Sequence, residues 1–212
     1  MSEARRRTEV LRILSRYLVE VVEAYDLCPW ARRARERGEL QIDIVWGTPT
    51  IGEWVTACEA LSVHKQAPVA MVVAPELVIG AGKLHDLRND VSNRIQSAGI
   101  AEFHPEAPLD LLTPARLVPY LRRSPDPLLQ LVPLSLLASV RGDSPTVDRM
   151  HQVQALGGVA VPPRRDAGDR IADDNHATVS AAHAAITSTL EDIAEDRRRS
   201  YELVGISASR TR

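Results

Sequence analysis

The sequence is poor in aromatic residues and cysteines and contains no long apolar run. Phe, Trp and Tyr make up only 4% of the 212 residues, so a folded core must consist mainly of Leu, Val, Ala and Ile. No apolar run approaches the ~20 residues needed to cross a bilayer. The N-terminal residues 1–7 are charged and lack the apolar stretch of a secretory signal peptide. We therefore expect a cytoplasmic protein that has no membrane partner.

Cysteine content and net charge exclude further classes of protein. Two cysteines, Cys28 and Cys58, cannot form the disulfide framework of a small secreted domain, and there is no Cys-x-x-Cys pair of the kind found in structural zinc sites. Cys58 lies among small apolar residues and is predicted to pack in the core. The formal net charge of −2 argues against a nucleic-acid partner, because such proteins usually present a basic face. We expect a small-molecule partner, and the sequence leaves the oligomeric state open.

Apolar periodicity predicts a helix-rich chain with three strands. Spacings of three and four residues predict helices over 8–26, 30–37, 51–62, 82–97, 114–122, 127–140 and 174–203. Alternating or continuous apolar runs predict strands over 40–46, 67–74 and 100–103. Thr8 is a candidate N-cap for the first helix, and Gly38 is a candidate C-cap for the second. This order indicates the α+β or α/β class, in which helices cover a small, roughly three-stranded sheet.

The composition divides the chain into three parts. Residues 1–141 are predicted to form a single core α/β domain that carries all the motifs described below. Over residues 142–173 glycine, proline and charge increase and the apolar periodicity fades, which is typical of a loop or linker. Residues 174–212 are predicted to form a C-terminal helix that ends near Gly205 and packs on the core.

Cys28 lies in the segment Leu27-Cys28-Pro29-Trp30, where the first predicted helix ends. Pro29 disfavours helical geometry at the preceding residue, so the chain should leave the helix there. A thiolate needs nearby positive charge or backbone donors, and three arginines follow closely: Arg32, Arg33 and Arg35. The side chain could therefore be a metal or heme-iron ligand or a nucleophile. A small buried residue at a helix bend is an equally good interpretation of the pattern.

His104 follows the third predicted strand, in the segment Phe103-His104-Pro105. Strand ends in α/β folds often present ligand-binding groups, and Glu102 and Glu106 flank this histidine. A carboxylate could orient the imidazole or act as an acid or base itself. The alternative is a structural histidine that holds a turn in place.

Arg122 and Arg123 begin a third polar segment, which continues as Ser124-Pro125-Asp126-Pro127. Guanidinium groups bind carboxylates and phosphates in bidentate fashion, so these arginines suit an acidic substrate or a propionate-bearing cofactor. The competing interpretation is a solvated helix end, where positive charge is favourable.

Together these segments resemble the bacterial family called domain of unknown function 1415. That family has Leu-Cys-Pro-Phe, Phe-His-Pro and Asn-Arg-Ser-Pro-Tyr-Pro elements in the same order, matched here over roughly residues 10–140. The family then has a His followed by Arg-Glu, whereas this chain has Gln130, Pro133 and Leu134 at those places. The resemblance implies a shared fold and site, but the family has no settled activity.

The Cys28-Pro29 pair is also similar to the proximal Cys-Pro of fungal heme-thiolate peroxygenases, in which the cysteine ligates the heme iron. This similarity implies heme as the cofactor, with Cys28 as the metal ligand and Arg122 and Arg123 binding its propionates. The implied catalytic residues are His104, Glu106 and Arg123.

We therefore expect a heme-thiolate-type oxidoreductase that acts on a small molecule with O2 or peroxide. One alternative is a cofactor-free thiol enzyme with Cys28 as nucleophile and His104 as base. The other is a non-catalytic ligand-binding module.

Overall fold

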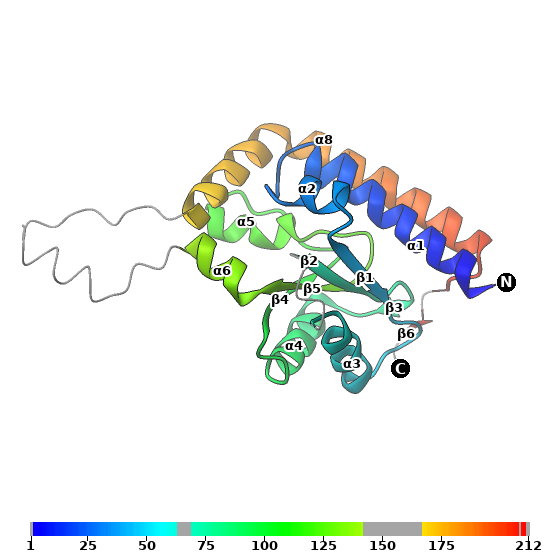
Figure 1. Cartoon of the computed structure of the whole chain (residues 1–212). Coiled ribbons are helices and arrows are strands. Elements are labelled where there is room, and N and C mark those ends of the chain that lie inside the picture. Colours follow the sequence, from blue (N-terminus) through cyan, green and yellow to red (C-terminus); the bar gives the residue numbers. More distant parts are fainter. Residues whose placement is uncertain (1, 63–68, 142–166, 208, 211–212) are drawn as a thin grey trace, which may run out of the picture.

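A mixed four-stranded sheet forms the centre of the protein, and helices cover both of its faces (Figure 1). The computed structural model describes residues 2–62, 69–141, 167–207 and 209–210. The strand order is β1-β2-β5-β4, with bounds Leu40–Ile44, Val69–Val73, Leu128–Pro133 and Ala98–Phe103 respectively. Strands β1 and β2 are parallel, whereas β5 runs antiparallel to both β2 and β4. The α+β class is confirmed, and the sheet has four strands instead of the expected three.

Strand β5 is the main correction to the sequence analysis, because residues 128–133 were predicted to be helical. The strand lies between β2 and β4 and is covered on both faces, so Leu128 and Leu129 are both fully buried although they point to opposite sides. A strand buried on both faces has a continuous apolar run instead of an alternating pattern, and such a run resembles part of a buried helix. The helical prediction holds only for α6 (Leu134–Arg141), which follows directly.

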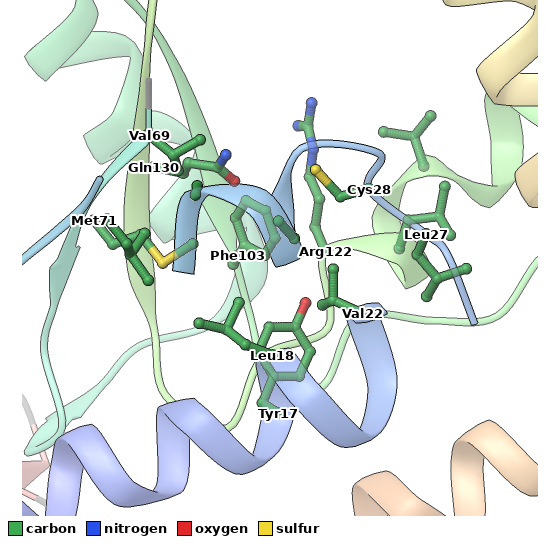
Figure 2. A pocket seen from close by; sticks show the side chains of 15 residues that line it. Tyr17, Leu18, Val22, Leu27, Cys28, Val69, Met71, Phe103, Arg122 and Gln130 are labelled. Atoms are coloured by element: carbon green, nitrogen blue, oxygen red, sulfur yellow. The ribbon is translucent and has the colours of Figure 1, made fainter. Parts of the chain in front are cut away.

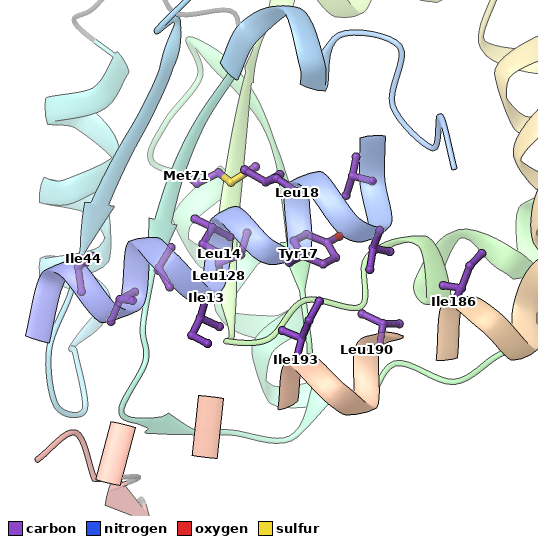
Figure 3. Packing of buried hydrophobic residues seen from close by; sticks show 14 of the residues in the cluster. Ile13, Leu14, Tyr17, Leu18, Ile44, Met71, Leu128, Ile186, Leu190 and Ile193 are labelled. Atoms are coloured by element: carbon purple, nitrogen blue, oxygen red, sulfur yellow. The ribbon is translucent and has the colours of Figure 1, made fainter. Parts of the chain in front are cut away.

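One face of the sheet packs against the N-terminal and C-terminal helices. Helix α1 (Glu3–Tyr17) continues into a π-helix, η1 (Leu18–Glu23), and lies along α8 (Ala167–Leu203). Every second residue of the strands points toward these helices, as Ile44 and Met71 do in Figure 3. The short helices α2 (Ala31–Glu36) and α5 (Pro114–Leu121) complete this layer. The larger of the two apolar cores therefore lies between the sheet and α1 and α8.

The opposite face of the sheet packs against α3 (Ile51–Ser62) and α4 (Ala81–Ser92). Its core contains Trp54, Val72 and Leu129, and it also contains Cys58, which is fully buried. The prediction that Cys58 is a core residue is confirmed. A second, two-stranded sheet pairs β3 (Leu77–Val78) in parallel with β6 (Ser209–Arg210).

The helix ends differ from the predicted ones at three places. Helix α4 ends at Ser92, so residues 93–97, predicted to be helical, form a turn and loop before β4. Helix α1 begins at Glu3, so Thr8 lies inside it and its hydroxyl donates to the Ala4 carbonyl oxygen, which makes the N-cap prediction wrong. Helix α8 begins at Ala167, so the predicted loop 142–173 is helical over 167–173, and the rest of it lies outside the described residues. Gly38 follows α2 with φ of 66°, as expected of a C-cap. Within the described ranges, no helix has the length and apolarity that crossing a membrane requires.

Candidate functional site

The segment that carries Cys28 is held in an unusual backbone path between η1 and α2. The π-helix ends at Glu23, and Asp26 adopts a left-handed conformation with φ of 51°, which aspartate tolerates better than most residues. From α8, the buried amide of Asn175 donates to the Leu27 carbonyl oxygen at 3.1 Å. The helix therefore ends before the Cys-Pro pair, as the proline predicts, and a hydrogen bond from α8 to the preceding residue helps to fix the position of Cys28.

Cys28 lines a largely apolar cavity of about 220 Å³ between α1, η1, α2, α5 and the sheet (Figure 2). The apolar lining residues are Leu18, Val22, Leu27, Ala31, Ala34, Leu40, Val69, Met71, Phe103, Val118 and Leu121. If each non-hydrogen atom takes the ~30 Å³ that a water molecule occupies in the liquid, the cavity holds roughly seven of them. Its size and lining suit a small, mainly apolar molecule.

Four polar side chains line the same cavity: Tyr17, Cys28, Arg122 and Gln130. Figure 2 shows the Cys28 sulfur, the Tyr17 hydroxyl and the Gln130 amide pointing toward the space between them. Gln130 lies in the middle of β5, paired with Met71 on one side and Ala101 on the other. It is therefore a polar residue on a sheet face that is otherwise apolar at this point.

The Tyr17 hydroxyl has no hydrogen-bond partner among the described residues, although only 2% of Tyr17 is exposed. The fully buried unpaired atoms of the described residues are Arg6 Nε and Trp54 Nε1, so the Tyr17 oxygen retains some exposed surface, which faces the cavity. The amide of Gln130, a half-buried residue, also has no partner among the described residues. Burial, with the nearby Cys28 sulfur as a second cause, raises the pKa of the Tyr17 hydroxyl, so it remains protonated at neutral pH. Buried polar groups almost always have a partner. An oxygen atom of a ligand, or water, placed in the cavity would provide one.

The thiol of Cys28 is subject to two opposing influences. Burial raises its pKa, and the backbone N–H groups of Trp30 and Ala31 act in the opposite direction. Burial is the larger influence, so the pKa of Cys28 lies above that of an ordinary cysteine. At neutral pH the side chain is therefore a neutral thiol, not a thiolate. The three arginines that follow it in sequence do not reverse this, and Arg35 instead pairs with Glu23 at 2.6 Å.

Arg122 brings positive charge to the cavity from the C-terminal end of α5. Burial lowers its pKa, while the Glu102 carboxylate, 3.9 Å from Nη1, acts in the opposite direction. Glu102 is shared, because it also accepts from Arg88 at 2.9 Å and lies 3.0 Å from His85 Nδ1. The charge of Arg122 is thus only partly balanced within the protein, and an anionic ligand group would balance it better.

His104 does not line the Cys28 cavity, and both of its ring nitrogens are engaged. Nε2 lies 2.8 Å from the Ile79 carbonyl oxygen, and Nδ1 accepts from the Glu106 backbone N–H at 3.0 Å. This pair of contacts requires the neutral tautomer with its proton on Nε2. Only 7% of His104 is exposed. The structure therefore does not bring the imidazole together with the thiol, and His104 ties β4 to the segment before α4.

Glu106 and Arg123 also lie outside the cavity. The Glu106 side chain is exposed, and only its backbone takes part in holding His104. Arg123 donates through Nε to the Pro105 carbonyl oxygen at 2.9 Å, so it holds the turn after His104. Of the residues predicted to form one site, the structure brings together Cys28 and Arg122.

Neither Tyr17, Gln130 nor the role of Asp126 was predicted as part of the site. Tyr17 belongs to the apolar stripe of α1 and does not stand out in the sequence. Gln130 belongs to a segment predicted as helix and was noted only as the position where the resembling family has a histidine. Asp126 is buried, accepts from Arg197 and Tyr201 at 2.7 Å each, and so fastens the Ser-Pro-Asp-Pro turn to α8. The turn places β5, and with it Gln130, beneath the cavity.

No protein-family model, curated protein or solved structure matches this chain. The resemblance to the domain of unknown function 1415 family stays a prediction. Among the described residues, no group of three or more His, Cys, Asp or Glu side chains is arranged to hold a metal ion.

Proposed function

We propose that the protein binds a small, mainly apolar molecule carrying an oxygen acceptor, such as a short-chain carboxylic acid or carbonyl compound, in the Cys28 cavity. The observation that carries this proposal is the Tyr17 hydroxyl, which faces the cavity, is protonated and has no hydrogen-bond partner among the described residues. A hydrogen bond of this kind contributes roughly 0.5–1.5 kcal/mol net. A ligand oxygen in the cavity could accept it.

The other polar groups of the cavity favour the same class of ligand. The Gln130 amide can donate, and the Arg122 guanidinium donates and carries positive charge, so both suit a carbonyl or carboxylate oxygen. The apolar side chains that make up the rest of the lining suit an alkyl chain. Hexanoate, with eight non-hydrogen atoms, approximates the size estimated above. We use it as the reference ligand.

Heme fits this cavity poorly. A volume of about 220 Å³ lies below the ~300–1,000 Å³ typical of pockets for drug-sized ligands, and a heme is larger than most such ligands. Arg123, expected to bind a propionate, is engaged with the Pro105 carbonyl oxygen. Heme as the cofactor stays a prediction of the sequence.

A cofactor-free thiol enzyme is the second candidate. The backbone N–H groups of Trp30 and Ala31 favour the charged form of the Cys28 sulfur, and backbone donors of this kind stabilise a thiolate once it forms. A carbonyl carbon held by Tyr17 would lie in the same cavity as that sulfur. His104 is not placed to take the thiol proton, so the proton would have to leave to solvent or to the ligand. The test is turnover of short-chain thioesters, which Cys28→Ser should abolish if this candidate is correct.

Thermal unfolding in the presence of hexanoate tests the binding proposal. A ligand at a hundred times its Kd stabilises the folded state by ~2.7 kcal/mol. For a chain of this length that corresponds to a rise in Tm of roughly 5–10 °C. Val118→Phe, which fills part of the cavity from α5, should remove most of this rise.

The matched control is Val55→Phe, a partly buried helical valine that packs against the opposite core and does not line the cavity. This variant should respond to hexanoate as the unmodified protein does. The proposal is wrong if hexanoate raises the Tm of Val118→Phe as much as that of Val55→Phe. It is also wrong if hexanoate does not raise the Tm of the unmodified protein.

A further inference from the structure

A second, polar hollow of about 380 Å³ lies next to the apolar cavity. It is lined by Glu23, Asp26, Cys28, Pro29, Arg32, Arg33, Glu36 and Arg37. Of all the residues that line the two hollows, Cys28 alone lines both. The cysteine therefore stands at the junction of an apolar and a charged compartment.

Helix α2 separates the two compartments. Ala31 and Ala34, three residues apart on one face of the helix, line the apolar cavity. The polar hollow is lined instead by four charged residues of the same stretch: Arg32, Arg33, Glu36 and Arg37. The small alanine side chains leave space on the inner side of the helix, and the long charged side chains form the outer wall.

The three guanidinium groups that line the polar hollow are matched in number by three carboxylates, but half of these six charges already have partners. Glu23 and Glu36 pair with Arg35, and Arg37 pairs with Glu39. Of the lining charges without an ion pair among the described residues, two are guanidinium groups, Arg32 and Arg33, and one is a carboxylate, Asp26. Within the part of the chain that the structure describes, Arg33 forms no ion pair. Its guanidinium is thus available to an anion.

We propose that the ligand of this site has two parts, an apolar chain that occupies the cavity and an anionic group, phosphate or carboxylate, that occupies the polar hollow at Arg33. The oxygen-bearing part that joins them lies beside Cys28. This inference rests on the proposed function, because it assigns the apolar part of the ligand to the same cavity. It adds that the natural ligand is longer than the cavity and passes Cys28.

Three probes separate the two parts of such a ligand. N-hexanoyl-phosphoethanolamine has the chain, an amide oxygen and a phosphate. N-ethylhexanamide lacks the phosphate, and phosphoethanolamine lacks the chain. Each is tested for its ability to protect Cys28 from alkylation by iodoacetamide, with the modified cysteine located by peptide mass spectrometry.

We expect N-hexanoyl-phosphoethanolamine to give half-maximal protection at a concentration at least about tenfold lower than either partial probe, because the two parts bind as one molecule. Arg33→Gln should remove most of this advantage and leave the protection by N-ethylhexanamide unchanged. The matched control is Arg199→Gln, an arginine on α8 whose side chain is 63% exposed, and it should change neither value.

The outcomes distinguish this inference from the function on which it rests. If N-ethylhexanamide protects and the phosphate adds nothing, or if Arg33→Gln has no effect, the two-part ligand is refuted and the cavity proposal stands. If N-ethylhexanamide gives no protection, the cavity proposal itself fails. If phosphoethanolamine alone protects as well as the complete probe, the apolar part has no role and both proposals are wrong.

Discussion

The Asp126 carboxylate should contribute more to stability than any exposed ion pair of the protein. Only 2% of Asp126 is exposed, and its two oxygens accept from the Arg197 guanidinium and from the Tyr201 hydroxyl. Arg197 also donates to the Pro75 carbonyl oxygen at 2.8 Å, so the cluster joins α8 to two loops at the end of the sheet. Asp126→Asn keeps the shape of the side chain and removes its charge.

The substitution should lower the free energy of unfolding because it leaves the Arg197 guanidinium without its carboxylate partner. Removing one partner of a buried ion pair costs ~3–5 kcal/mol, because the other charge stays uncompensated. The Arg197 side chain is 23% exposed, so water compensates part of the loss and we expect the lower value, about 3 kcal/mol. The Tm should fall by roughly 6–12 °C for a chain of this length. Urea unfolding followed by tryptophan fluorescence measures the free energy directly.

The matched control is Asp192→Asn, which removes a carboxylate that is 65% exposed and 2.7 Å from Arg16. Exposed pairs of this kind contribute ~0–1 kcal/mol. If Asp126→Asn lowers the free energy of unfolding no more than Asp192→Asn does, the buried Asp126 ion pair contributes no more to stability than an exposed one. The assignment of the Ser-Pro-Asp-Pro turn as a structural fastening would then be refuted.

Three further predictions concern the thiols, the α1–α8 interface and the packing of α6. Alkylation of Cys28 should have its pH midpoint above that of a free cysteine, because burial raises its pKa; Cys58, whose pKa burial raises to about 12, should react more slowly still. Hydrogen bonds from Arg12 and Arg16 of α1 hold the pKa of Asp196 well below its usual range. The ionised Asp196 side chain therefore stabilises the folded state at neutral pH, and this stabilisation decreases as the pH falls below about 4. The free energy of unfolding should therefore fall less between pH 7 and pH 3 in Asp196→Asn than in the unmodified protein. Gly99→Ala should cost ~1 kcal/mol in urea unfolding, because the added methyl group would meet the end of the Leu137 side chain of α6 and force it to shift.

Each of these predictions has a matched control. Both cysteines should react at the same rate in urea, where burial no longer distinguishes them. Ser188→Ala, at an exposed position of α8, changes no ionisable group and should leave the pH dependence of stability unchanged. Gly82→Ala, in an open part of α4, should be neutral or stabilising by up to ~1 kcal/mol. An equal effect of Gly82→Ala and Gly99→Ala would contradict the close packing of α6 on β4.

The local sequence pattern was sufficient to predict the helices that have one exposed face. Helix α3 and helix α5 have polar residues on one side, and their predicted bounds agree with the structure to within a residue. Strand β5 lacks such a face, because β2, β4 and both helical layers surround it. Its partners are set by long-range pairing, which a window of neighbouring residues does not contain.

The candidate site was predicted only in part for the same reason. Cys28 and Arg122 stood out because a proline and a charged turn mark their positions in the sequence. Tyr17 was hidden in an apolar stripe, and its importance depends on an unpaired hydroxyl inside the fold. His104 seemed catalytic from its place at a strand end, but its ring nitrogens are engaged by the Ile79 carbonyl and the Glu106 backbone N–H. These contacts cannot be deduced from the types of residue alone.

A crystal structure of the protein grown with hexanoate would test the central proposal most directly. The proposal predicts an alkyl chain in the cavity lined by Met71, Phe103 and Val118, with a carboxylate oxygen within hydrogen-bond distance of the Tyr17 hydroxyl. A cavity that holds only water at a saturating concentration of hexanoate would contradict it. So would a hexanoate molecule bound elsewhere on the protein while Tyr17 stays unpaired.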